Sequence, residues 1–151
     1  MPRFLCSVRL ALHPAQTINP HFLSDKRVNS MNFLDPEYKT SCDFQLTEYT
    51  SGDVPLDVSK NADENIAANR NRFGDYRERP GSRKNIKISG VSGIRYIIDR
   101  KSSMEDRDLI VYTFRIAYGN RTFTAFFRTT KDDFDRFRPM FDSIIESIRL
   151  K

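Results

Sequence analysis

Residues 112–137, YTFRIAYGNRTFTAFFRTTKDDFDRF, combine two strand-like runs with a turn signal between them and a helix start after them. Gly119 and Asn120 suit a two-residue hairpin turn with glycine first, which pairs Tyr118 with Arg121. This turn fixes the register, because a shift by one residue would move every side chain to the opposite face. The predicted pairs on the apolar face are Ile116 with Phe123, Phe114 with Ala125, and Tyr112 with Phe127.

The opposite face of the predicted hairpin is mixed in character. It pairs Arg115 with Thr124 and Val111 with Arg128. Val111 and Phe126 are expected to be exposed on this face, where they are available to another layer or to a partner. The first face is therefore predicted to be core, and the second to be half solvated.

A helix is predicted directly after the hairpin. Thr130 followed three residues later by Asp133 has the pattern of a helix start, where acidic side chains meet the positive end of the helix. Pro139 is well placed as the first residue of a second helical segment. A metal site is the alternative role of the acidic residues Asp132, Asp133 and Asp135, but acids are common at helix starts, and no metal is expected. An apolar stripe requires a sheet beneath the helix: Phe137, Phe141, Ile144, Ile145 and Ile148.

The rest of the chain supplies further strands and one more helix. An amphipathic helix is predicted over residues 57–73, with Asp57 or Ser59 as its cap and Gly74 as its stop. The predicted strands are residues 3–14, 28–38, 41–50, 85–90 and 93–99. The last two, together with the two arms of the hairpin, form an antiparallel meander. The predicted class is α+β, a single domain over residues 1–151 with an antiparallel sheet flanked by helices and the C-terminal helix packed on it.

Composition excludes several classes of protein. The chain has 151 residues, of which 38% are hydrophobic and 30% charged, and it contains no apolar run near the ~20 residues that span a bilayer. A signal peptide would have to use residues 4–14, but Arg9 interrupts that run and no small-residue cleavage site follows. Cys6, His13, His21 and Cys42 lack the close pairing of zinc sites, so neither a metal nor another cofactor is expected.

Positive charge is concentrated in one segment, residues 70–87. The net charge is +5, and this segment holds seven basic residues against Asp75 and Glu78. Such a segment either steers an acidic protein, a nucleic acid or an anionic lipid toward the domain, or is a solvated mobile loop. The predicted partner-binding residues are Arg70, Arg72, Arg77, Arg79, Arg83, Lys84 and Lys87.

The order of these elements resembles the PsbP/Mog-type superfamily, which includes DcrB-like domains. The likeness is carried by RLALHP, MNFLDPEYKTSCDFQL, PLDVSKNADENIAAN, ISGVSGIRYIID and the terminal hairpin with its helix. Members have an α/β/α sandwich and act by docking, as extrinsic subunits of photosystem II, Ran-binding proteins, lipoproteins and chaperones. The lack of a clean signal peptide favours the cytoplasm or an organelle interior, whereas the resemblance to the photosystem branch implies the thylakoid lumen.

Three classes of function follow from these patterns. The first is a non-catalytic accessory, assembly or chaperone-like protein that docks on a protein partner, with a photosystem II subunit as its narrower form. The second is an enzyme that uses His13 or His21 as a general base; no nucleophile or carboxylate accompanies either residue, so no catalytic residue is predicted. The third is nucleic-acid binding through residues 70–87, with Phe73 and Tyr76 stacking on bases.

Overall fold

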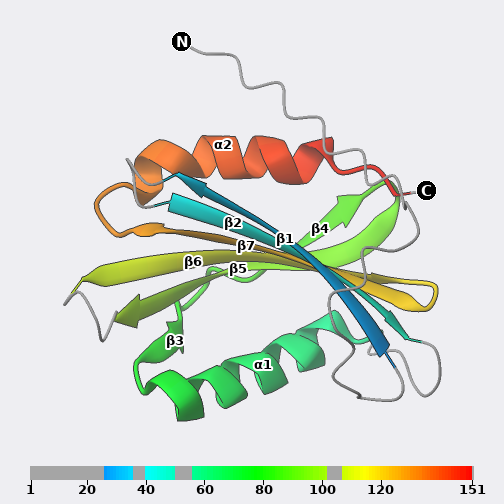
Figure 1. Ribbon diagram of the computed structural model, residues 1–151, viewed down its shortest axis with the longest axis horizontal. Coiled ribbons are helices and arrows are strands. Elements are labelled where there is room, and N and C mark those ends of the chain that lie inside the picture. The colour runs from blue at the N-terminus through cyan, green and yellow to red at the C-terminus, as the bar shows by residue number, and fades with distance from the viewer. Residues whose placement is uncertain (1–25, 36–39, 50–55, 102–106, 151) are drawn as a thin grey trace.

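A computed structural model of the chain describes residues 26–35, 40–49, 56–101 and 107–150 (Figure 1). Seven strands of this described part form one antiparallel sheet in the order β1-β2-β7-β6-β5-β3, and β4 pairs with β5 beside β3. Helix α2 covers one face of the sheet and α1 the other, which confirms the predicted α+β architecture. The elements are β1 (Lys26–Asp35), β2 (Thr40–Tyr49), α1 (Val58–Phe73), β3 (Tyr76–Glu78), β4 (Lys84–Ile88), β5 (Val91–Lys101), β6 (Asp108–Tyr118), β7 (Arg121–Thr130) and α2 (Phe134–Ser147).

The β6–β7 hairpin has the predicted register. Tyr118 pairs with Arg121 across the turn, and the following pairs on each face are those that the turn requires. Gly119 has a φ of 55°, a left-handed conformation that a residue with a side chain resists. A two-residue turn with glycine first therefore sets which residues of both strands face each helix.

The larger core lies between this hairpin and α2. The ring of Phe127 stacks on that of Phe141 at 4.6 Å, and Tyr112 packs beside both rings. The hydroxyl of Tyr112 donates a hydrogen bond of 2.6 Å to Asp142 on α2. The buried members of this core are Phe44, Leu46, Ile88, Ile97, Ile110, Tyr112, Phe114, Ile116, Phe123, Ala125, Phe127, Phe134, Phe141, Ile145 and Ile148.

Helix α2 corrects the prediction of two helical segments. It begins at Phe134 and runs without a break through Pro139. A proline inside a helix lacks the N–H that would bond to the carbonyl four residues earlier, here that of Asp135. Phe134 is buried on the sheet ahead of the proline, so packing holds the first turn in place. At the start of the helix, the Thr130 hydroxyl donates to the Asp133 carboxylate at 2.8 Å.

The second core lies beneath α1 on the other face of the sheet. Asp57 caps the helix by accepting a hydrogen bond of 2.9 Å from the Lys60 N–H, and Gly74 ends it, as predicted. Val111 is only 3% exposed in this core, so its predicted exposure is wrong: α1 itself is the additional layer. Phe126 is half-buried against the same cluster, whose buried members are Ala62, Ile66, Tyr76, Ile94, Tyr96, Ile98 and Val111.

Three further differences concern the strands. β3 lies in a segment that we expected to be a loop, because three residues with two charges give no strand pattern. The turn between β4 and β5 consists of Ser89 and Gly90, both with positive φ, and β5 starts at Val91, two residues before the predicted Gly93. The strand predicted over residues 3–14 lies outside the described residues.

The edge strand β1 exposes apolar side chains on both of its faces. Val28 is 52% exposed, Met31 52% and Leu34 67%. Its inner side pairs with β2 along all ten residues, whereas no strand of the described part pairs with its outer side.

Replacing Phe141 with alanine should lower the free energy of unfolding by about 3–5 kcal/mol, because a ring buried between α2 and the hairpin leaves a cavity. Urea denaturation measures this change. Met140→Ala, at an exposed neighbouring position, should cost less than about 0.5 kcal/mol. Equal costs for the two variants would contradict the packing of α2 on this face.

Gly93 is fixed by a close approach of two strands. A Cβ atom at this position would lie 2.6 Å from the backbone oxygen of Arg115 and 2.3 Å from a methyl carbon of Ile116. Because the backbone oxygen belongs to a paired strand, Gly93→Ala should destabilise the protein by about 1–3 kcal/mol. Thermal unfolding against Ser92→Ala, an exposed neighbour, checks this, and a neutral Gly93→Ala would show that β5 and β6 are farther apart.

Candidate functional site

The basic segment, residues 70–87, forms the edge of the sheet opposite β1. Its first residues form the last turn of α1. Two later parts of the segment, β3 and β4, pair with β5. The Arg79 N–H bonds to the Ile97 carbonyl at 2.8 Å, which attaches the turn between β3 and β4 to the sheet. The segment is therefore not a continuous loop, since two parts of it pair with β5.

Arg83 holds this turn against α1. Its guanidinium donates to both Glu78 oxygens at 2.9 and 2.6 Å, to Asp63 at 2.7 Å and to the Ser59 hydroxyl at 2.7 Å. These hydrogen bonds, first of all those to Glu78, raise the pKa of Arg83 above its ordinary value. Its cation also lies 5.6 Å from the ring centre of Tyr96. Arg83 therefore has a structural role in addition to any role in binding.

Arg79 is held in a similar way on the other face of the edge. Its guanidinium makes a bidentate pair with Asp99 at 3.1 and 2.7 Å and lies 5.7 Å from the Phe134 ring. The hydrogen bond to Asp99 is the main cause that raises the pKa of Arg79. Carboxylates of the same chain thus neutralise Arg79 and Arg83, and the positive potential of this edge comes from the remaining basic residues.

Five basic residues of the segment are exposed. Arg77 is the clearest case, with a side chain 78% exposed and a single carboxylate, that of Asp75, at 3.5 Å. The five are Arg70, Arg72, Arg77, Lys84 and Lys87. They lie on α1, β3 and β4, so five of the seven predicted partner-binding residues are exposed to solvent.

The two aromatic residues of the segment, Phe73 and Tyr76, differ in exposure. Tyr76 is 5% exposed and belongs to the core beneath α1, where burial raises its pKa to about 12. The ring of Phe73 is contacted by the guanidinium of Arg72 at 5.1 Å and by that of Arg100 at 4.1 Å. The predicted stacking role of Tyr76 is therefore wrong, whereas that of Phe73, which is 36% exposed, stays a prediction.

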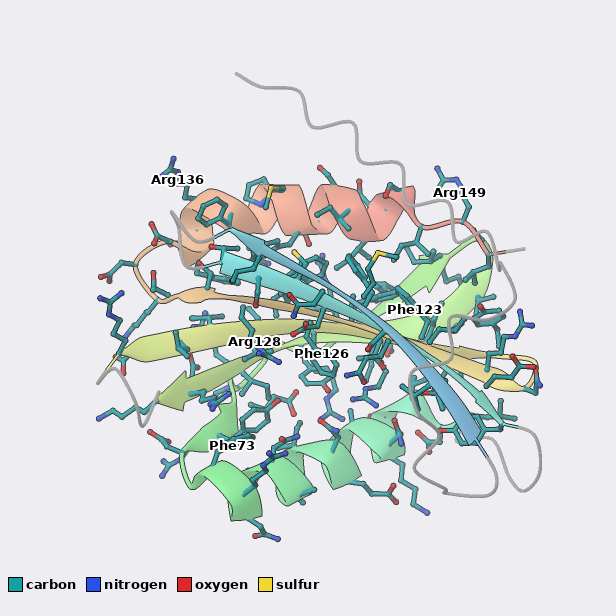
Figure 2. All side chains as sticks on the ribbon, in the orientation of Figure 1. Phe73, Phe123, Phe126, Arg128, Arg136 and Arg149 are labelled. Carbon is teal, nitrogen blue, oxygen red and sulfur yellow. The ribbon has the colours of Figure 1, made fainter. Side chains whose placement is uncertain are left out.

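Arg100 and Arg128 are site residues that the sequence did not indicate. Arg128 and Phe126 lie on the side of the sheet that faces α1, and Phe73 lies at the end of that helix (Figure 2). Arg100 reaches the same helix end from β5. Their only sequence signal is strand alternation, which places basic side chains at α1-facing positions and gives no information about which strands become neighbours.

A cleft of about 480 Å³ opens where β3, β5 and β6 end near the start of α2. It is lined by charged groups of both signs, and the Arg79–Asp99 pair forms part of its wall. Its lining residues are Asp75, Arg77, Arg79, Asp99, Arg100, Lys101, Asp108, Leu109 and Lys131. Such a surface suits contact with a charged partner.

Among the residues that the structure describes, no three His, Cys, Asp or Glu side chains gather as they would around a metal ion. Cys42 lies half-buried on β2. Cys6, His13 and His21 lie outside the described residues. Neither described helix is long and apolar enough to span a bilayer.

Comparison with known proteins places the fold. No protein-family model matches the chain, and no curated protein matches it in sequence. Its structure is similar to that of PsbP from Synechocystis sp. PCC 6803 (CyanoP), with a TM-score of 0.50 and 9% identity over 92% of this chain and 100% of that one. The fold is PsbP-like. PA94 from Pseudomonas aeruginosa, a candidate regulator of unknown function, shares this PsbP-like fold with the chain at a TM-score of 0.61 and 16% identity, over 88% of this chain and 89% of that one.

Arg83→Gln should lower the free energy of unfolding by about 1–3 kcal/mol, because it removes charge-assisted hydrogen bonds and leaves Glu78 without its partner. Arg77→Gln removes an equal charge at an exposed position and should change stability by less than about 0.5 kcal/mol. Denaturant unfolding of both variants measures the difference. Equal stabilities would show that the segment is not anchored through Arg83.

Proposed function

We propose that the protein is a non-catalytic accessory protein that docks on a protein partner through its basic edge. The observation that carries this proposal is a difference in pairing and exposure among the seven basic residues of the segment. Arg79 and Arg83 are neutralised by carboxylates of the same chain, whereas the other five are exposed, and among the described residues a single carboxylate, that of Asp75, contacts them.

The electrostatic attraction of exposed cations on a sheet edge extends over longer distances than apolar contacts do. Unpaired surface charges attract an oppositely charged surface and raise the rate of encounter. The same charges on β3 and β4 discourage pairing of this edge with another strand. The partner surface expected from this arrangement is acidic and meets the side chains of the edge.

Charge reversal tests this docking edge. In the variant Arg77→Glu, Lys84→Glu, Lys87→Glu, association with the partner captured from the native source should slow at least tenfold at low salt. The difference from the parent should shrink as salt rises, because charges are screened over about 10 Å at 0.1 M. Surface plasmon resonance across a salt series measures both effects.

The control is Lys60→Glu, which reverses an exposed charge on α1 outside the segment. It should associate at nearly the parent rate, and both proteins should unfold within about 2 °C of the parent, since exposed substitutions change stability little. If the triple variant associates as fast as the parent at every salt concentration, docking does not use this edge.

The narrower roles rest on different supports. The role of a photosystem II subunit is implied by the family resemblance, and it stays a prediction. Nucleic-acid binding loses part of its aromatic support, because Tyr76 is buried, whereas Phe73 is 36% exposed with the guanidinium groups of Arg72 and Arg100 against its ring. Single-stranded DNA in the same binding assay separates that function from protein docking.

A further inference from the structure

Three arginines from three different elements surround the end of α1. Arg72 comes from the last turn of α1, Arg100 from β5 and Arg128 from β7. Arg72 and Arg100 both contact the ring of Phe73, and Arg128 lies close enough to Arg100 to repel it. The side chains of Arg72 and Arg128 are open to solvent, so the cluster can be reached from outside.

The cluster holds more positive than negative charge. Arg128 pairs with Asp43 at 2.9 Å, and Asp43 also accepts a hydrogen bond from Asn32. Arg72 has an ordinary explanation, since a cation near the C-terminal end of a helix is favourable. Arg100 has none: no carboxylate of the described residues pairs with it, and its Nε is buried without a hydrogen-bond partner. Burial, followed by Arg128 and Arg72, lowers the pKa of its guanidinium.

A half-buried guanidinium beside two others is unfavourable unless an anion joins it. Three arginines and the Asp43 carboxylate leave a net charge of +2. A phosphate monoester carries about −1.5 to −2 at neutral pH, whereas a carboxylate or a phosphodiester carries only −1. Guanidinium groups also match the oxygens of phosphate in a bidentate manner.

We propose that Arg72, Arg100 and Arg128 form a binding site for a single phosphate monoester. Arg72 and Arg100 both contact the ring of Phe73, and Arg128 lies on the same α1-facing side of the sheet, a compact grouping that suits one phosphate group and not a nucleic-acid backbone. Arg72 belongs to both the basic edge and this cluster, so docking is tested with Arg77, Lys84 and Lys87, which are not members of the cluster. The phosphate can be free or can belong to a phosphorylated protein side chain, since both present the same group.

Inorganic phosphate is the first probe. Added to the protein, it should raise the melting temperature progressively and shift the Arg100 Nε–H signal in a nitrogen–proton NMR spectrum. Sodium chloride at equal ionic strength should do neither. A phosphoserine peptide that binds more tightly than inorganic phosphate would assign a phosphoprotein as the source, and equal binding would assign a free phosphate or small phosphorylated molecule.

Variants of the arginines test whether phosphate binds at this cluster. Arg100→Gln and Arg128→Gln should each weaken phosphate binding about tenfold or more, because each removes a charge-assisted hydrogen bond. Arg100→Lys keeps the charge but loses the planar fork, so it should also weaken binding while the protein stays folded. Arg77→Gln, which removes an equal charge outside the cluster, should weaken binding less than twofold.

Two results would overturn this proposal. One is a phosphate effect that chloride reproduces or that Arg100→Gln and Arg100→Lys leave unchanged. The other is equal binding of diethyl phosphate, or tighter binding of longer oligonucleotides without a terminal phosphate, since either would indicate a site for diester phosphates. Neither result bears on docking through Arg77, Lys84 and Lys87.

Discussion

The register of the β6–β7 hairpin is the constraint on which the rest of the molecule depends. Each residue of these strands faces either α2 or α1, and the turn at Gly119 and Asn120 decides which. A slip of β7 by one residue would place Arg128 in the aromatic core and turn Phe127 toward α1. The two cores, the anchoring of α2 and the position of the arginine cluster all follow from this one turn.

The features that were predicted correctly depend on residues that are close together in the sequence. The hairpin, both ends of α1 and the apolar stripe of α2 each lie within a short stretch of sequence, and the structure has all of them. The prediction for Pro139 was wrong because the sequence shows the missing N–H but not the burial of Phe134 that holds the turn before it. β3 was missed because Tyr76–Glu78 is a strand only through its pairing with β5.

The candidate site was predicted in part, because exposure depends on neighbours far along the chain. Nothing in the sequence distinguishes Arg79 and Arg83 from the other basic residues of their segment. In the structure, Arg79 pairs with Asp99, and Arg83 pairs with Asp63 and Glu78. Val111 was expected to be exposed because the hairpin sequence does not show that α1 packs over this face of the sheet. Arg100 and Arg128 are 28 positions apart in the chain and meet through the strand order, which single-sequence patterns do not give.

The two edges of the sheet differ in a way that limits self-assembly. Growth of a sheet from molecule to molecule requires two edges that accept a new strand. The β3 and β4 edge is short, interrupted by a turn and positively charged, so two copies of it repel each other. The β1 edge is long and apolar on both faces. Strand addition between two copies of β1 would leave only basic edges outside, so such association would stop at a closed pair and would not continue into a fibre.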